Sequence, residues 1–264
     1  MQRTPSSNST AAAWTWAACG LLVGAVLATL WWAPAAWLVR TVAATTQGKV
    51  LLTDATGTVW SGSAGLTLTG GAGSRDAARL PGRVHWSLAP GWGTLRLKLG
   101  ADCCTTDPLE LALAPAWPGW TLHIARHQSR WPASVLAGLG TPWNTLQLQG
   151  NLVLDTSAMV LTTTFDRWTL QGSVQLDAQE MQSRLSGLRP LGSYRLGVTG
   201  GDQPALTLST QRGALQLQGQ GRWTAGRLRF EGEASATPEH AQELSNLLNI
   251  IGRRDGARSV ITLG

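Results

Sequence analysis

Residues 95–99 read LRLKL, residues 109–113 read LELAL and residues 120–124 read WTLHI. In each stretch a large apolar residue occupies every second position, and polar residues or, at position 112, alanine stand between them. This period of two is typical of strands that bury one face and expose the other to water. The pattern therefore predicts antiparallel strands that are covered on one side.

The same alternation continues through most of the chain. It recurs at residues 84–88, 146–154, 168–176, 206–208, 215–217 and 228–230. Glycine ends or interrupts many of these stretches, and short strands at this spacing usually make a sandwich, a barrel or a long curved sheet. We therefore expect a mainly β fold, with an antiparallel, curved or barrel-like β domain.

The first strands of this domain are predicted near residue 49. Residues 49–52 and 57–62 read as two strands joined by a turn at Asp54–Gly57, because aspartate and glycine suit turn positions. The glycine-rich run at residues 70–74 lacks the lysine and the spacing of a phosphate loop, so it is interpreted as a turn. The pentapeptide LQLQG occurs at residues 146 and 215, which raises the hypothesis of an internal duplication.

Two helices are expected to interrupt the strands. The first lies near residues 131–139 and ends before Gly140. The second is a short amphipathic helix near the C-terminus, with Thr237 as its cap, Pro238 at its first position and an apolar stripe over residues 241–251. A last strand is predicted at residues 259–263.

Residues 14–38 form an apolar stretch of 25 residues without a charge. As a helix this stretch would be about 37 Å long, enough to cross a bilayer. Tryptophans mark both of its ends, as they do at membrane interfaces, and Pro34 predicts a kink. We interpret residues 14–38 as an uncleaved transmembrane anchor rather than as a cleaved signal peptide or a buried core helix.

The topology follows from this anchor. A short head before one large domain is typical of a signal anchor, so residues 1–13 are expected in the cytoplasm and residues 39–264 in the periplasm. Only two lysines accompany 19 arginines, a bias that suggests a GC-rich bacterial genome. The expected location is a bacterial inner membrane, crossed once, where residues 14–38 contact lipid.

The composition excludes some classes of protein. The net charge is +6, but the basic residues are spread out, so nothing indicates nucleic-acid binding. Charged residues make up 14% of the chain, below the ~25% of an average soluble domain. We therefore expect the domain to present neutral polar or apolar surface to a partner.

No pattern of residues specifies catalysis. The four histidines lie outside known catalytic and zinc motifs, and His123 and His127 could share a strand face but have no third ligand nearby. Asp102, Asp107 and Glu110 form no convincing acid–base pair. We expect no enzyme activity, no catalytic, cofactor-binding or metal-binding residues, no cofactor and no small-molecule substrate.

Two features leave alternatives open. Cys103 and Cys104 could form a vicinal disulfide, stay unpaired as small apolar residues, or bond two copies of the chain. The exposed polar segment at residues 141–145 contains Trp143, which is either a plug in the core or an anchor at an interface. The plug is the preferred interpretation.

The chain resembles the type II secretion system protein N family over nearly its whole length. The resemblance rests on the anchor and, after it, on KVLLTDATGTVWSGSAGLTLTGG from Lys49, LPGRVHW from Leu80, GLGTPWNTLQLQG from Gly138, SRLSGLRPLGSYRL from Ser183 and NLLNIIGRR from Asn246. It implies a non-enzymatic inner-membrane component that assists export of folded periplasmic proteins, with other secretion subunits as partners.

Two other hypotheses compete with this one. Glycine-punctuated sheets behind an N-terminal anchor also look like AsmA-type envelope proteins, in which an apolar sheet groove binds or moves lipid. A closed core would explain the same leucine pattern. The other hypothesis is a periplasmic hydrolase with an unrecognised site.

Overall fold

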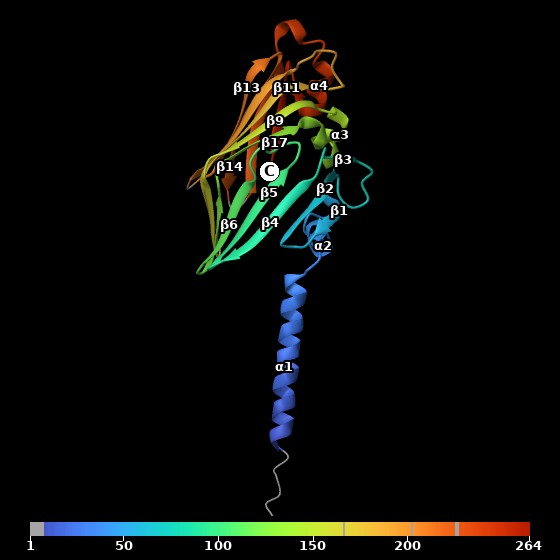
Figure 1. Cartoon of the computed structure of the whole chain (residues 1–264). Helices are drawn as coiled ribbons and strands as arrows, with labels where there is room; N and C mark the ends of the chain where they lie inside the picture. The colour runs from blue at the N-terminus through green and yellow to red at the C-terminus, as the bar shows by residue number, and fades with distance from the viewer. Residues whose placement is uncertain (1–7, 166, 202, 225–226) are drawn as a thin grey trace, which may run out of the picture.

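The computed structural model describes residues 8–165, 167–201, 203–224 and 227–264, without the side chains of residues 8–13, 15, 224 and 263. Two helices come first, α1 (Asn8–Trp31) and α2 (Ala35–Thr45). The helix α1 stands away from the rest of the molecule as a stalk (Figure 1). From Trp16 to Trp31 every side chain is exposed. Among the residues described, no helix is both long and apolar enough to cross a membrane.

The chain breaks between α1 and α2, where the sequence predicted only a kink. Proline has no amide hydrogen to donate within a helix and disfavours helical backbone before it, so Pro34 ends the first helix and precedes the second. The backbone amide of Val59 donates to the carbonyl of Ala33, and Ala35 is buried. Residues 35–38 therefore belong to the packing of the β domain rather than to one continuous helix over 14–38.

The described residues after α2 form 17 strands, which confirms a mainly antiparallel β fold. They are β1 (Val50–Gly57), β2 (Ser61–Thr69), β3 (Ala77–Arg79), β4 (Val84–Gly91), β5 (Thr94–Ala101), β6 (Leu109–Ala116), β7 (Gly119–Ile124), β8 (His127–Pro132), β9 (Gln149–Thr156), β10 (Met159–Thr164), β11 (Arg167–Gln182), β12 (Gly192–Gly201), β13 (Ala205–Gly213), β14 (Leu215–Thr224), β15 (Arg227–Ala236), β16 (Arg253–Asp255) and β17 (Arg258–Leu263).

The sheet is one antiparallel meander. From β4 to β7 and from β10 to β15 each strand pairs with the next strand in the chain, and β8 pairs with β9. At the C-terminal end β17 rather than β16 lies beside β15. The strand β7 pairs with β10, and β8, which continues β7, pairs with β9. The two pairings share one register, since Ile124 pairs with Met159 and His127 with Thr156. In the described residues β1 pairs only with β2 and β16 only with β17, so the sheet is open.

Short helices connect several strands at one end of the sheet. They are η1 (Ala133–Leu139), α3 (Trp143–Leu146), η2 (Pro238–His240) and α4 (Ser245–Ile251). The first predicted helix is a 3₁₀ helix that begins after β8, and the second is η2 followed by α4. Thr237 makes no side-chain capping bond, so its predicted role as a cap is wrong. The predicted last strand is confirmed as β17.

Two local predictions are wrong: the turn at residues 54–57 and the internal duplication marked by LQLQG. Residues 54–57 do not turn the chain, because Asp54 adopts a φ of +51° and a register shift between Thr53 and Thr56 absorbs the irregularity as a bulge within β1. The LQLQG repeat has no structural counterpart either: residue 146 ends α3, whereas residue 215 starts β14.

Side chains divide the sheet into two faces, which we call the apolar face and the polar face. On the apolar face, Leu97 of β5 lies opposite Leu111 of β6, and Leu113 of β6 opposite Leu122 of β7. On the polar face, Lys98 and Glu110 form an ion pair at 2.6 Å. This is the division that the alternating sequence predicts.

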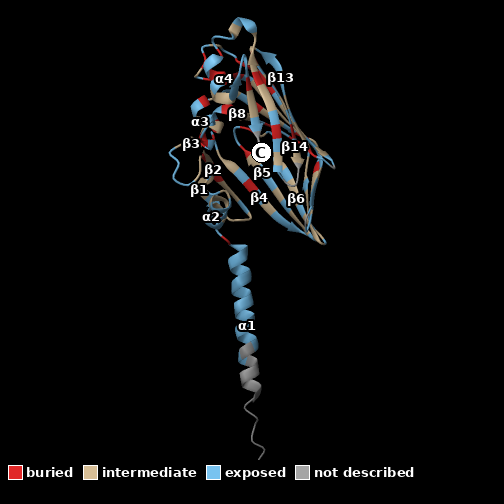
Figure 2. Cartoon of the chain, turned by 180° about the vertical axis from the view of Figure 1, so that it is seen from behind, coloured by how far each residue is buried: buried red, intermediate tan, exposed pale blue. Residues whose placement is uncertain are grey.

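Helices cover only parts of the apolar face. The helix α2 packs near Ala64 and Trp86, and η1 lies against the cluster of Leu80, Ala101, Cys104 and Val135. The largest core cluster lies around α4, where Leu244, Leu247 and Leu248 are at most 1% exposed. Figure 2 shows the buried residues concentrated near the helices, with mostly intermediate and exposed strands away from them.

Candidate functional site

The carboxylates around the β5–β6 connection are held in separate contacts rather than in one site. Asp102 accepts a hydrogen bond from the backbone amide of Arg83 at 3.0 Å and contacts Nε2 of His85 at 2.7 Å. The amide of Arg83, with help from His85, lowers the pKa of Asp102. Glu110 pairs with Lys98, whose hydrogen bond lowers the pKa of that carboxyl. Asp102 and Glu110 thus each bind a separate partner.

The two histidines considered for a metal lie in different surroundings. His123 is exposed on β7, while His127 is buried, and its backbone amide donates to Oγ1 of Thr156. Over the described ranges no group of three or more His, Cys, Asp or Glu residues is placed to hold a metal ion. The glycine-rich run at residues 70–74 connects β2 to β3, with Gly71 and Gly73 at positive φ, as in a turn.

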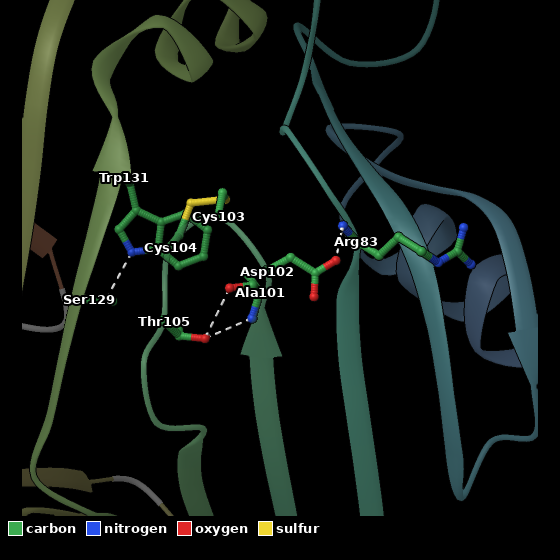
Figure 3. The surroundings of a disulfide bond; sticks show 8 residues. All are labelled: Arg83, Ala101, Asp102, Cys103, Cys104, Thr105, Ser129 and Trp131. Carbon is green, nitrogen blue, oxygen red and sulfur yellow. Dashed lines mark hydrogen bonds between the residues drawn. A yellow bond between two sulfur atoms is a disulfide. The ribbon is translucent and has the colours of Figure 1, made fainter.

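Cys103 and Cys104 form a disulfide with each other, which selects one of the three alternatives left open by the sequence. Cys104 is buried, and Trp131 packs against its cluster and donates from Nε1 to Oγ of Ser129 at 2.8 Å (Figure 3). Next in the chain, Thr105 bonds through Oγ1 to the amide and carbonyl of Ala101. The backbone amide of Arg130 in β8 donates to the carbonyl of Cys104 at 2.8 Å, which ties the β5–β6 connection to β8.

Trp143 is not the plug that the sequence favoured. Its exposed fraction is 37%, and the buried residue of α3 is Leu146. The adjacent Asn144 donates from Nδ2 to Asp76 at 2.9 Å, which ties α3 to the segment before β3. The short helix α3 therefore buries its leucine and leaves its tryptophan partly open to solvent.

Part of the apolar face is left uncovered by the helices. Over β5–β7 and β11, away from the helices, four large apolar side chains keep 36–40% of their surface exposed: Leu99, Leu113, Trp120 and Trp168. Register places Trp120 opposite Thr163, and Thr163 opposite Trp168, so these side chains lie in neighbouring rows. The alternating sequence predicted the apolar face, but it did not indicate which part of that face the helices would leave uncovered.

A family model described as "Type II secretion system (T2SS), protein N" matches residues 48–261. The chain belongs to the type II secretion system protein N family. The match begins just before β1 and ends within β17, so it spans the whole sheet and leaves α1 and α2 outside. No curated protein and no solved structure matches the chain. The resemblance seen in the sequence is confirmed.

Membership in the protein N family indicates a role in type II secretion and contacts with other subunits of that system. The region that matches the family model is, in this protein N chain, an open sheet whose apolar face is only partly covered. The surfaces open to a partner are thus the uncovered apolar face, the polar face and the exposed Trp143.

Proposed function

We propose that this chain is a non-enzymatic inner-membrane component of the type II secretion system that assists export of folded periplasmic proteins through contacts with other subunits. The observation that carries the proposal is the family match over the entire sheet. The ion pairs of the polar face support the non-enzymatic part, because Asp102 and Glu110 each bind a neighbouring side chain and face no shared reaction site.

In this proposal the part of residues 14–38 that belongs to α1 anchors the chain in the membrane, and residues 35–38 pack against the β domain. Residues 1–13 lie in the cytoplasm and residues 39–264 in the periplasm. Support comes from α1, which is helical over Asn8–Trp31 and carries no charged residue. At 1.5 Å per residue, 24 residues extend about 36 Å, close to the thickness of the hydrocarbon core. The exposed tryptophans at positions 14, 16, 31 and 32 stand at the two ends, where indoles prefer the membrane interface.

Protease accessibility tests this topology. In intact cells protease added outside should leave the sheet whole, and in spheroplasts it should digest the sheet while a tag before residue 14 stays protected. A sheet digested only after the spheroplasts are lysed would place the domain in the cytoplasm and refute the topology.

A second function, binding or moving lipid along the sheet as in AsmA-type proteins, is favoured by the uncovered part of the apolar face. The face is apolar across β5, β6 and β7, and Leu99 and Leu113 keep more than a third of their surface exposed. An exposed apolar surface of this kind is typical of an interaction site. An acyl chain or an apolar protein segment would complete it.

Affinity purification of the full-length protein from its own membrane separates the two functions. Secretion subunits recovered without stoichiometric lipid would support the secretion component, while stoichiometric lipid without those subunits would overturn it in favour of a lipid carrier. Leu113→Gln, on the apolar face, should remove bound lipid from a carrier. Ala112→Gln is the matched control, because the neighbouring residue on β6 faces the opposite side.

A further inference from the structure

The turns of the meander fall alternately at two ends of the sheet. The β1–β2 turn marks the end next to α1, because the indole Nε1 of Trp60 in that turn donates to the carbonyl of Leu30 at 2.8 Å. Antiparallel pairing then places the β4–β5, β6–β7 and β10–β11 turns at the same end. The helices α3 and α4 lie at the opposite end (Figure 1).

Each of these three turns carries an aromatic side chain at its tip. Trp92 is fully exposed at 104%, Trp117 is 96% exposed and Phe165 is 80% exposed. In the described part of the β domain no other large apolar side chain exceeds 46% exposure. Three bare aromatic rings at successive hairpin tips are unlike singly scattered surface residues, and they indicate a contact that the isolated chain lacks.

The hairpin tips lie at the end of the molecule where α1 joins the β domain, and this position indicates what they contact. The hairpins that end β4 and β6 reach down to about the height at which α1 leaves the domain (Figure 1). Trp31 and Trp32 stand at that end of α1 with 72% and 74% of their surface exposed. Tryptophan has an apolar ring and one polar N–H group, a combination that favours the headgroup layer of a bilayer.

We propose that Trp92, Trp117 and Phe165, the aromatic rim, insert into the headgroup layer of the membrane that α1 crosses. The inference rests on the proposed anchoring role of α1. The partner is the phospholipid surface on the side of the sheet, and the strands then rise from that surface toward α4. Trp120 and Trp168 each lie one residue pair beyond the last pair before the turn of their hairpin. The uncovered apolar face therefore begins next to the lipid.

The rim acts mainly through apolar contact rather than through charge. Contacts between exposed charges weaken when salt shortens the Debye length, whereas burial of an aromatic ring does not depend on ionic strength in this way. One anchoring helix alone would leave the domain free to tilt about residues 31–34. Three further contacts at one end fix the direction of the strands relative to the membrane.

Photocrosslinking of the full-length chain in vesicles of phosphatidylcholine and phosphatidylglycerol tests the rim. Benzoylphenylalanine replaces one residue at a time, at positions 92, 117 and 165, and adducts with phospholipid are detected by mass spectrometry. Trp143, an exposed tryptophan at the opposite end, is the matched control, and Leu22 in the middle of α1 reports on the anchor. We expect lipid adducts at the three tips and at position 22, unchanged in high salt, and none at position 143.

The outcomes separate the rim from the anchor. Adducts at position 22 without adducts at the tips would overturn the rim and leave the anchor in place. Adducts at neither would overturn both. Adducts at position 143 equal to those at the tips would show unspecific labelling of exposed positions and would also overturn the rim. Since the tips make no core contacts, each variant should unfold at the temperature of the unmodified chain, which verifies that the fold is intact.

Discussion

Replacing Leu248 by alanine should destabilise the protein far more than replacing Leu113 by alanine. Leu248 is 1% exposed, in the core cluster that α4 forms with the sheet. Its truncation removes buried methyl groups and leaves a cavity, which we expect to cost about 3 kcal/mol. Leu113 is 38% exposed and has no covering element, so its loss should cost about 1 kcal/mol or less.

Thermal unfolding of the full chain in detergent micelles, followed by circular dichroism, measures the difference. For a domain of this size about 3 kcal/mol lowers Tm by roughly 6–12 °C, and about 1 kcal/mol lowers it by roughly 2–4 °C. Urea unfolding gives an independent value. If Leu113→Ala lowered Tm as much as Leu248→Ala, Leu113 on β6 would be buried as completely as Leu248 in α4. The conclusion that the apolar face is open at β6 would then be refuted.

Three further predictions concern single residues. Arg195 lowers the pKa of Asp177 through a hydrogen bond, so their pair stabilises the protein at neutral pH, and this stabilisation is lost as pH falls through the pKa of that carboxyl. Asp177→Asn should therefore cost under about 1 kcal/mol of stability at neutral pH, measured as a lower Tm, and should leave Tm unchanged in acid. An equal loss at both pH values would contradict this. Among the residues that the structure describes, the buried hydroxyl of Tyr194 has no hydrogen-bond partner, so Tyr194→Phe should keep or raise the free energy of unfolding by up to about 1 kcal/mol in urea, and a clear loss would contradict this. A methyl group on Gly138 would lie 2.3 Å from the carbonyl oxygen of Leu68. Gly138→Ala should therefore lower the free energy of unfolding in urea by about 2 kcal/mol or more, whereas an unchanged free energy would mean that η1 can shift.

The sequence predicted the faces of the sheet better than its connections. Alternation correctly separates Leu97 from Lys98, because side chains of a strand point to opposite faces whatever the neighbouring strand is. The bulge at Asp54 could not be predicted, because aspartate and glycine suit a turn and a bulge equally well. The C-terminal helix followed from its apolar stripe, and Leu244, Leu247 and Leu248 are indeed buried.

The bonding and burial of single side chains were less predictable than the faces of the sheet. The bond between Cys103 and Cys104 was one of three alternatives, and local geometry selects among them. Trp143 was expected inside, since a large aromatic residue usually buries its surface, yet Leu146 takes that position. The aromatic rim does have a sequence signal: Trp92 stands between two glycines and Trp117 before Pro118 and Gly119, both in turns between alternating stretches. Placing them at one end requires the order of the strands.

The meander order of the strands has a consequence for how the protein folds during synthesis. Most strands from β4 to β15 pair with the strand made just before them, so most pairings close a short loop, whereas β10 pairs back with β7 and β11 also pairs with β9. Contacts that are local in sequence are formed quickly, and a growing chain needs no later segment to complete them. The sheet can therefore be laid down one hairpin at a time as the polypeptide emerges, N-terminal strands first. The strand β7 gains its partner β10 after β8 and β9 are made, and β15 pairs with β17 and α4 packs against the sheet when the C-terminal residues are made.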